Sequence, residues 1–446
     1  ADTREQGGQV AARALVDRVA VVLGGTLRLL SPITVMASPV VATSFAPGFL
    51  RDPAKLALTG ELIKLTFPYL LLISLTGFAG AILNSYQRFA VPALTPILLN
   101  LSLIAAALWF APGFDEPVVA LALGVLVAGF AQLLFQVPAL AGIGLMPRPR
   151  WAPRHEGVRR IMVLMVPALF GVSVSQINLL LDTVLASLLP AGSVSWLYYS
   201  DRLTELPLGV FAIAIATVLL PTLSGQRARA DDPAFASTLS WAIRSVLLIA
   251  IPATAALAIL AEPLLATLFQ YGAFSGDDRA MAAASLRAYT LGLGAFMLVK
   301  VLAPGFYARE DMRTPVRIGI IAMVANMVLN IAFVFPLMWW LNLGHVGLAL
   351  ATSVSAWLNA LLLFRGLRRD AVLTDGSLPL KWLAQLGVAT AAMVSVLLWL
   401  MPDHSMWAGW LWWQRALQLG ILCGAGLGAF GVSLLCCGVR LADLRR

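Results

Sequence analysis

Long apolar runs alternate with short polar stretches along the whole of this sequence. Runs of about 20 apolar residues recur from one end to the other, and each is long enough to cross the hydrocarbon core of a bilayer as a helix. Proline, glycine and charged residues separate the runs, as expected of turns between helices. The pattern predicts twelve transmembrane helices, at residues 15–45, 57–86, 91–111, 117–144, 158–189, 194–223, 238–270, 279–307, 315–336, 345–367, 380–401 and 411–438.

The composition favours a membrane protein over a soluble one. Of the 446 residues, 60% are hydrophobic and 12% are charged, whereas soluble domains carry roughly 25% charged residues. No stretch between the apolar runs is long enough to bury a soluble core, so we predict an all-α polytopic membrane protein. The net charge of +9 does not indicate a nucleic-acid partner, because the arginines and lysines lie in short loops between the apolar runs.

The arginines indicate which loops face the cytoplasm. Positive charge in short loops stays on the cytoplasmic side of a membrane, and alternate loops of the predicted topology carry most of it. This set holds Arg88, Arg148, Arg150, Arg154, Arg159, Arg160, Arg227, Arg229, Arg309, Arg313, Arg317, Arg365, Arg368, Arg369, Arg440, Arg445 and Arg446. Both ends of this chain are therefore predicted to face the cytoplasm.

An internal repeat relates two parts of the chain. The stretch Pro39–Phe45 matches Pro263–Phe269 at a shift of 224 residues. Three further matches keep a shift between 220 and 224 residues: Tyr69 with Tyr289, Tyr86-x-Arg88 with Tyr307-x-Arg309, and Pro92 with Pro315. An even number of predicted helices separates the copies, so both run in the same direction. This is typical of transporters whose two halves are related by an axis along the membrane normal.

The repeat also predicts helices that this chain does not contain. Ala1 falls opposite Gly225, so the fifth and sixth predicted helices, residues 158–223, have no counterpart in the first copy. We therefore expect two further helices ahead of Ala1 in the complete protein, for about fourteen in all. In this chain we predict a first lobe at 1–150, a second lobe at 151–370, and two additional transmembrane helices at 371–446.

Several local motifs agree with this division into lobes. They are Gly171–Ile177, Gly192–Trp196, Tyr198–Leu203, Phe67–Tyr69, Gly80–Asn84 and Lys300–Tyr307. On these motifs the chain resembles, over essentially its whole length, the MurJ family of lipid II flippases in the multidrug/oligosaccharidyl-lipid/polysaccharide exporter superfamily.

The resemblance implies a transporter and not an enzyme. Members move lipid II, an undecaprenyl pyrophosphate that carries a disaccharide-pentapeptide, from the cytoplasmic to the periplasmic leaflet of the bacterial inner membrane. They do so by alternating access around a central cationic cavity, and the two additional helices form a groove for the lipid tail. Lipid II and membrane lipids are the implied partners. We further expect a monomer that works beside the cell-wall synthesis machinery.

A charged cluster inside the sixth predicted helix is the candidate substrate site. Asp201, Arg202 and Glu205 are spaced so that all three can share one helical face, and charges within a membrane span usually face a cavity or a partner. Two interpretations are open: a self-neutralising cluster that holds helices together, or an arginine that binds pyrophosphate between two carboxylates. In the resembling family the matching arginine lines the substrate cavity. Lys300 is a further candidate for the cavity.

The family's other cavity arginines lie in its first two helices. We therefore expect this chain to supply only part of the anion site and to be inactive by itself.

A second group of polar residues suggests a cation site. Asp182, Asn326, Asn330 and Thr352 lie on three predicted helices and offer oxygen atoms that can hold Na⁺. The alternative is that the asparagines form hydrogen bonds that pack the helices. No cofactor is expected beyond Na⁺, and coupling to the membrane potential is the other candidate energy source.

Three other functions compete with the lipid II assignment. A membrane transferase would need paired carboxylates on a metal or a histidine base, and the three histidines, His155, His345 and His404, are isolated in predicted loops. A drug/cation antiporter would favour acidic cavity residues without an arginine. A polysaccharide-lipid flippase of the same superfamily remains the alternative that only substrate chemistry can separate.

Overall fold

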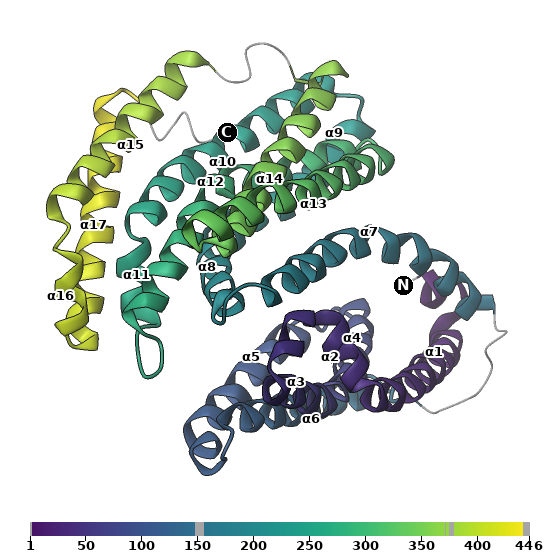
Figure 1. Ribbon diagram of the computed structural model, residues 1–446. Coiled ribbons are helices and arrows are strands. Elements are labelled where there is room, and N and C mark those ends of the chain that lie inside the picture. Colours follow the sequence, from purple (N-terminus) through teal and green to yellow (C-terminus); the bar gives the residue numbers. More distant parts are fainter. Residues whose placement is uncertain (1, 148–155, 371, 374–378, 440–446) are drawn as a thin grey trace. The chain divides into compact units, whose positions relative to one another are not determined.

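The computed structural model describes residues 2–147, 156–370, 372–373 and 379–439, except for the side chains of 2–12, of most of 156–175, and of 404, 405 and 408. Six of the predicted loop and tail arginines lie outside the described residues: Arg148, Arg150, Arg154, Arg440, Arg445 and Arg446. Every regular element in the described part of the chain is a helix, and the chain divides into two compact units, Ala1–Val172 and Ser173–Arg446 (Figure 1).

The first unit is centred on α6. Its helices are α1 (Asp2–Met36), α2 (Ser38–Phe45), α3 (Pro53–Thr66), α4 (Tyr69–Ser85), α5 (Ala90–Ala105) and α6 (Pro117–Gly142). Helices α3, α4 and α5 all contact α6. Small residues allow this approach: a Cβ atom on Gly129 of α6 would lie 2.7 Å from the Tyr69 ring of α4.

The second unit is built around α12. Its helices are α8 (Ser193–Pro207), α9 (Ile213–Ala228), α10 (Asp232–Ile259), α11 (Ala261–Leu268), α12 (Gly276–Tyr307), α13 (Arg313–Leu341), α14 (Gly344–Arg369), α15 (Leu380–Leu400), α16 (His404–Gly409) and α17 (Trp412–Cys436). Helix α7 (Glu156–Ser187) begins in the first unit and ends in the second. Helices α8, α9, α10, α11, α13 and α14 contact α12, which therefore forms the centre of this unit.

Most predicted transmembrane helices are confirmed. Eleven helices in the described part of the chain are long and apolar enough to cross a membrane, and each matches one of the predicted spans. The twelfth prediction, 158–189, coincides with α7, part of whose side chains lie outside the described residues. The predicted span 194–223 holds α8 and α9, joined without a break by a π-helical turn at Leu208–Ala212.

Three spans predicted as continuous are each broken into two helices. Span 57–86 breaks at Phe67–Pro68, between α3 and α4. Spans 15–45 and 238–270 break into a long and a short helix, at Ala37 between α1 and α2 and at Leu260 between α10 and α11. A proline stands in the first turn of each short helix, Pro39 in α2 and Pro263 in α11, where the missing N–H costs nothing. These two predictions were wrong for the same reason, because the sequence stays apolar through the break.

The shared break supports the internal repeat, since α2 and α11 are the two copies of the Pro39–Phe45 motif. A second shared feature corrects one alignment. The turns after α4 and α12 place Gln87 and Glu310 at positive φ (59° and 62°). Arg88 N donates to Leu83 O and Asp311 N donates to Phe306 O in the same pattern. The structural shift here is 223 residues, so Tyr86 corresponds to Arg309 and not to Tyr307.

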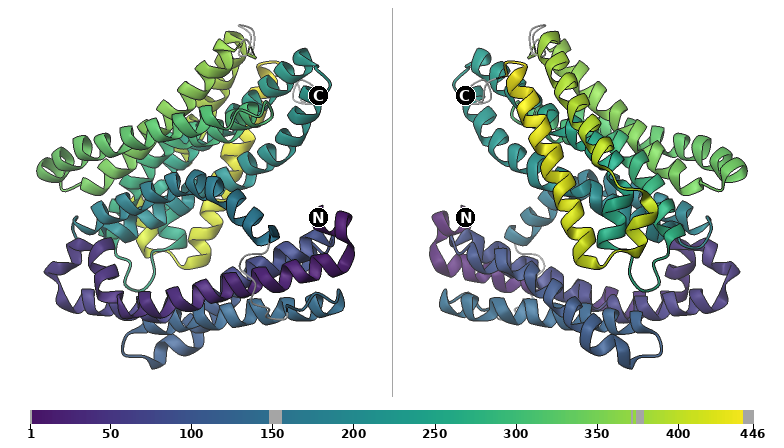
Figure 2. Two further views of the ribbon diagram at one scale, coloured as in Figure 1. Left: turned by 90° about the vertical axis from the view of Figure 1, so that its right-hand side faces the viewer. Right: turned by 90° about the vertical axis from the view of Figure 1, so that its left-hand side faces the viewer.

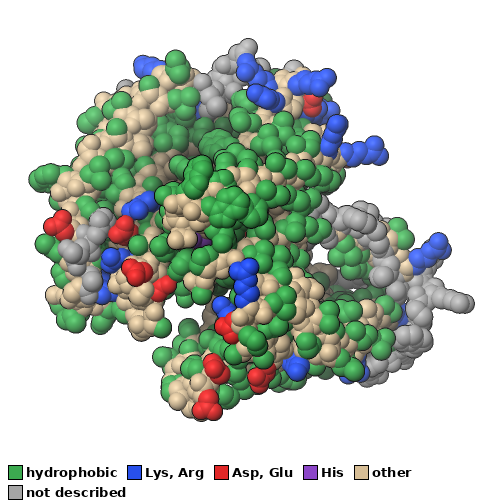
Figure 3. All heavy atoms as spheres, viewed as in Figure 1, with side chains coloured by type: hydrophobic (Ala, Val, Ile, Leu, Met, Phe, Trp, Pro, Cys, Tyr) green, Lys and Arg blue, Asp and Glu red, His purple; other side chains and the backbone are tan. Residues whose placement is uncertain are grey.

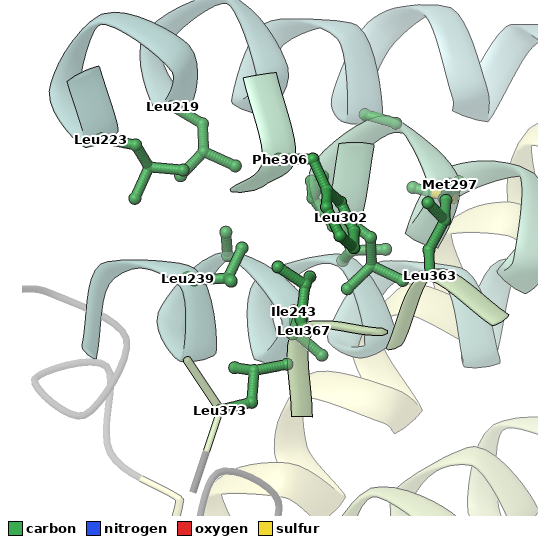
Figure 4. Close-up of a cluster of buried hydrophobic side chains, with 14 of the residues drawn as sticks. Leu219, Leu223, Leu239, Ile243, Met297, Leu302, Phe306, Leu363, Leu367 and Leu373 are labelled. Carbon is green, nitrogen blue, oxygen red and sulfur yellow. The ribbon is translucent and has the colours of Figure 1, made fainter. Parts of the chain in front are cut away.

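The largest buried cluster joins α9, α10, α12 and α14 at one end of the second unit. Leu239 and Ile243 of α10, Leu302 and Phe306 of α12, and Leu367 of α14 are all essentially buried (Figure 4). A Cβ atom on Gly305 would lie within 3.4 Å of both Leu239 and Leu367, so the glycine allows the three helices to meet. This packing fixes the end of α12 that carries Lys300.

The C-terminal helices form a hairpin beside α10 and α11. Figure 2 shows α15 and α17 running alongside each other, with the short α16 between them in the chain. Trp407 of α16 is buried with Met393, Leu397 and Leu422, and it packs against Leu260 and Ala266. Arg415 of α17 is also buried and donates to the carbonyl oxygens of Ala266 (2.9 Å) and Gln270 (3.1 Å), at the end of α11.

Hydrophobic side chains cover much of the face seen in Figure 3, and many of the lysines and arginines lie along its upper right edge. Trp339 and Trp340 at the end of α13 are 75% and 83% exposed. This surface is typical of a protein whose helices face lipid, with aromatic side chains at the membrane interface.

Candidate functional site

Helix α8, which carries the charged cluster, is held at its first turns against α12 and α14. Gly192 has φ +99°, and a Cβ atom there would lie 2.6 Å from the Trp196 ring, so only glycine admits this indole. The Trp196 indole donates to Asp278 Oδ1 (2.7 Å), and Asp278 caps the start of α12. One turn on, the Ser200 hydroxyl donates to the Ala282 carbonyl oxygen (2.7 Å).

The predicted cluster forms one accessible turn of α8. The Arg202 guanidinium pairs with Glu205 Oε2 and lies 4.9 Å from the centre of the Tyr198 ring. The side chains of Arg202 and Glu205 are 53% and 49% exposed. Asp201 is half-buried, and within the part of the chain that the structure describes no hydrogen bond or ion pair holds it. The Arg202 side chain of this turn is therefore accessible to a ligand.

This geometry suits the binding of an anion. A guanidinium has five N–H donors, and the pair with Glu205 occupies only part of them. The remaining donors of Arg202 face an accessible surface and can bind phosphate oxygens in the two-pronged manner that arginine favours. The exposed Glu205 pair by itself contributes little to stability, since exposed ion pairs are worth about 0–1 kcal/mol.

Lys300 lies on α12, well along the helix from the α8 contact. Its side chain is exposed, and among the described residues no hydrogen bond or ion pair joins it to the Asp201–Glu205 turn. The structure thus brings Asp201, Arg202 and Glu205 together but does not place Lys300 with them, and its role stays a prediction.

The four predicted cation-site residues do come together, across α7, α13 and α14. Asn330 Nδ2 donates to Asp182 Oδ1 (2.7 Å) and to Asn326 Oδ1 (3.0 Å). Asn326 Nδ2 in turn lies 3.4 Å from Thr352 Oγ1. Asn326 and Asn330 are 1% and 0% exposed, so the network is enclosed between helices.

Two further residues belong to this network and were missed in the sequence. Asn178 Nδ2 lies 3.4 Å from Asp182 Oδ2, and Ser355 Oγ accepts from Asn326 Nδ2 at 3.3 Å. Asn178 stands one turn before Asp182 on α7, and Ser355 one turn after Thr352 on α14. Helical spacing from the predicted residues was the signal that could have found both.

The network leaves two of its acceptor oxygens unused. Among the described residues, Asn178 Oδ1 and Asn330 Oδ1 are buried and have no hydrogen-bond partner, although both amides donate through their Nδ2 atoms. A buried acceptor left unpaired costs about 1–3 kcal/mol, so hydrogen bonding between helices alone does not account for this arrangement. One carboxylate and several amide and hydroxyl oxygens fit the oxygen ligands that Na⁺ takes, and these residues can hold it.

The sequence predicted that all three histidines lie in loops, and the structure differs from this prediction. His345 is not in a loop but in the first turn of α14, buried against the Trp196 ring (4.9 Å between ring centres) and 3.1 Å from the Met281 carbonyl oxygen. His404 is the first residue of α16, and His155 lies outside the described residues. Within the described residues no cluster of three or more histidine, cysteine or acidic side chains could hold a metal ion.

The helices, the open arginine turn on α8 and the enclosed polar network define a multi-pass membrane transporter. The Lipid II flippase MurJ family model matches residues 2–413, and this chain belongs to that family. It is 47% identical over 440 residues to the probable lipid II flippase MurJ of Vibrio cholerae, covering 97% of this chain and 83% of that protein. It is 42% identical over 453 residues to the Haemophilus influenzae counterpart, covering 99% and 88%.

The fold agrees with this membership. A solved structure described as lipid II flippase MurJ in an inward closed conformation matches with a TM-score of 0.77 at 23% identity, covering 94% of this chain and 83% of that one. At this identity the match concerns the arrangement of the helices. This chain therefore shares its arrangement of helices with that structure.

Proposed function

We propose that this protein moves lipid II from the cytoplasmic to the periplasmic leaflet by alternating access. The observation that carries the proposal is membership of the lipid II flippase family over residues 2–413. The accessible Arg202 turn on α8 agrees with it, because the head of a polyprenyl pyrophosphate is an anion. A transport function also suits a protein with eleven apolar helices in its described part.

Within this function, Arg202 binds the pyrophosphate, and the neighbouring carboxylates of Glu205 and Asp201 set the affinity of this binding. Glu205 pairs with the guanidinium and competes with the phosphate for the same donors. Release of the substrate then needs only the return of Arg202 to its carboxylate. Asp201 adds a second negative charge beside the arginine, and Lys300 supplies a further cation along α12.

The polar network on α7, α13 and α14 is the proposed Na⁺ site. Asp182, Asn326, Asn330 and Thr352 hold the ion, helped by Asn178 and Ser355. Bound there, Na⁺ neutralises Asp182 and offsets the two unpaired amide oxygens. The transmembrane Na⁺ gradient would then bias one conformation over the other, and coupling to the membrane potential is the alternative source of energy.

The remaining features of the proposal follow from sequence. The protein lies in the bacterial inner membrane with its C-terminus in the cytoplasm, and it acts as a monomer beside the cell-wall synthesis machinery. Residues 1–150 and 151–370 form the two lobes, and 371–446 form the additional pair of helices that accommodates the lipid tail.

The test is the exposure of lipid II on the outer face of the membrane. Depletion of the protein in its own cells, in the absence of any other flippase, should protect lipid II from an enzyme confined to the periplasm while lipid II accumulates inside. A complementing copy that carries Arg202→Ala should restore cleavage at least about tenfold less well, because charge-assisted hydrogen bonds are worth about 1.5–3 kcal/mol. Arg227→Ala is the matched control, since this exposed arginine pairs with Asp232 at the end of α9.

Normal cleavage after depletion would show that lipid II is the wrong substrate. Equal complementation by the Arg202→Ala and Arg227→Ala copies would leave the function intact but remove Arg202 from the substrate site.

A further inference from the structure

Tyr198, Arg202 and Glu205 form a stripe along one side of α8. Their spacing of four and then three residues places them on one helical face, and all three side chains are exposed. Leu197 and Ser200, on the other side of the helix, are buried. Charged side chains within a membrane span face a cavity or a partner and not hydrocarbon. This stripe is therefore the side of α8 that meets a ligand.

The Arg202 guanidinium has one neighbour at its edge and another on its face. Its Nη1 atom pairs with Glu205 Oε2, and its Cζ atom lies over the Tyr198 ring, 4.9 Å from the ring centre. A ring attracts a cation that lies within about 6 Å of its centre. The five N–H donors of a guanidinium lie in its own plane. The ring therefore restrains Arg202 from one face and leaves the donors that Glu205 does not use available to a ligand.

The Tyr198 ring is itself held by other aromatic rings. It meets the Tyr199 ring edge to face, with 6.0 Å between the ring centres and 73° between the planes. Tyr199 in turn lies 4.6 Å from Phe269 and 5.4 Å from Phe274, at the turn between α11 and α12. Such aromatic pairs are stabilising beyond the area that they bury. The surface on which Arg202 rests is thus fixed to the packed part of the second unit, although Tyr198 is 55% exposed.

This support matters because an arginine side chain is flexible. It has large rotamer entropy, and the part that is lost when a ligand binds lowers the affinity. The exposed ion pair with Glu205 is weak and holds the guanidinium at one edge only, so the group could still rotate about that contact. A ring against its face removes this freedom before the ligand arrives. Such preorganisation increases affinity without a new contact to the ligand.

We propose that Tyr198 is a positioning residue, which holds the Arg202 guanidinium with its free N–H edge aligned for the pyrophosphate of the lipid substrate. This inference rests on the proposed function. The aromatic ring is the functional part of Tyr198, because the face of the ring attracts the cation. Tyr198 and Glu205 therefore act differently on the same arginine. The carboxylate competes with phosphate for N–H donors, whereas the ring orients the guanidinium and occupies no donor.

The experiment measures the Kd of lipid II for the whole protein in nanodiscs. Tyr198→Leu replaces the ring by an apolar side chain and should raise the Kd about fivefold, which corresponds to the upper range for an exposed cation–π contact. Tyr198→Phe keeps the ring and removes the hydroxyl, so its Kd should stay within about twofold of the wild-type value. Because Tyr198 is exposed, both variants should unfold at the same temperature as the wild type, which thermal unfolding checks.

A double-mutant cycle separates positioning from a direct contact with the lipid. In Arg202→Ala the ring has no guanidinium to hold, so the addition of Tyr198→Leu should change the Kd by less than about twofold. Tyr271→Leu is the matched control, because this tyrosine is 48% exposed and its ring lies 5.5 Å from another guanidinium, that of Arg415. The Kd of this control should equal that of the wild type.

Three results would overturn the inference and leave the proposed function standing. They are wild-type affinity in Tyr198→Leu, the same loss on addition of Tyr198→Leu to Arg202→Ala, and an equal loss in Tyr198→Phe and Tyr198→Leu. The last two would make Tyr198 a direct contact of the lipid and not a support for Arg202. If the wild-type protein does not bind lipid II, the proposed function fails and the role of Tyr198 fails with it.

Discussion

The polar networks of the two units occupy related helices but differ in kind. In the first unit, the Tyr69 hydroxyl of α4 donates to Gln132 Oε1 (3.1 Å), and Gln136 Nε2 donates to Thr95 Oγ1 (3.0 Å), which joins α6 to α5. In the second unit, α13 and α14 are the counterparts of α5 and α6 and carry part of the network. The network there also includes Asp182 of α7, to which Asn330 donates.

The difference is one of charge and of unused acceptors. The first network is neutral, and its one buried acceptor without a partner is Gln136 Oε1 among the described side chains. The second holds a carboxylate together with two such amide oxygens, on Asn178 and Asn330. Neutral hydrogen bonds between membrane helices serve as packing contacts, whereas a carboxylate among free oxygens is the composition of a cation site. The same repeated scaffold thus carries packing contacts in one copy and a candidate ion site in the other.

Removal of the charge in the second network should have the largest effect. Asp182→Ala deletes the one carboxylate among its six residues, so we expect the affinity for Na⁺ to fall at least about 100-fold, or about 2.7 kcal/mol at 1.36 kcal/mol for each tenfold step. Na⁺-dependent protection against thermal unfolding measures this loss. Gln132→Leu, in the first network, should leave the affinity unchanged. Equal Na⁺ protection of the wild type and Asp182→Ala would erase the proposed difference between the two networks.

A glycine in each unit tests how closely its helices pack. Gly292→Ala places a Cβ atom 2.8 Å from Ser353 Cα, a backbone atom, and should lower the free energy of unfolding by about 2–3 kcal/mol. Gly129→Ala meets only the side chains of Tyr69 and Leu72, which can move, so we expect about 1 kcal/mol. Denaturant unfolding in mild detergent provides the measurement.

Gly319→Ala on α13 is the control for both glycine variants, because no other group lies within 4 Å of the added Cβ atom. A larger loss for Gly129→Ala than for Gly292→Ala would mean that α4 and α6 pack more rigidly than α12 and α14.

Loss of a residue from the neutral network of the first unit should have a smaller effect on the free energy of unfolding. Gln132→Leu removes the acceptor of the Tyr69 hydroxyl and the donor to the Thr95 carbonyl oxygen (3.3 Å). Hydrogen bonds between membrane helices are worth about 0.6 kcal/mol on average, so we expect the free energy of unfolding to fall by about 1 kcal/mol. The Na⁺-dependent protection against thermal unfolding should not change. A loss of that protection would make the first network part of the ion site.

Hydropathy predicted the helices well and their breaks poorly. The breaks at Ala37 and Leu260 leave no mark in an apolar run, because a proline two or three residues beyond a break is compatible with a continuing helix in any window average. The repeat pointed to the same places, since Pro39 and Pro263 head its most similar stretch. A proline that recurs in both copies was the signal that a break should be expected there.

The candidate sites also could be predicted only in part from the sequence. Asp182 and Asn330 are 148 residues apart and still lie together. They could be paired from sequence because polar residues in membrane spans are rare and find one another. Asn178 and Ser355 are ordinary polar residues without a charge, and their place in the network depends on which faces of α7, α13 and α14 meet. Hydropathy carries no information about that meeting, so only the packed structure reveals it.

The smallest effect is expected at Tyr69 of the first network. Tyr69→Phe removes one hydrogen bond from a half-buried hydroxyl and should lower the free energy of unfolding by about 0.6 kcal/mol, with the Na⁺-dependent protection against thermal unfolding intact. The first network is neutral, so the loss of one of its hydrogen bonds should reduce packing stability without a change in ion affinity. A loss of Na⁺ protection in Tyr69→Phe would instead make the first network part of the ion site, and the proposed difference between the two units would fail.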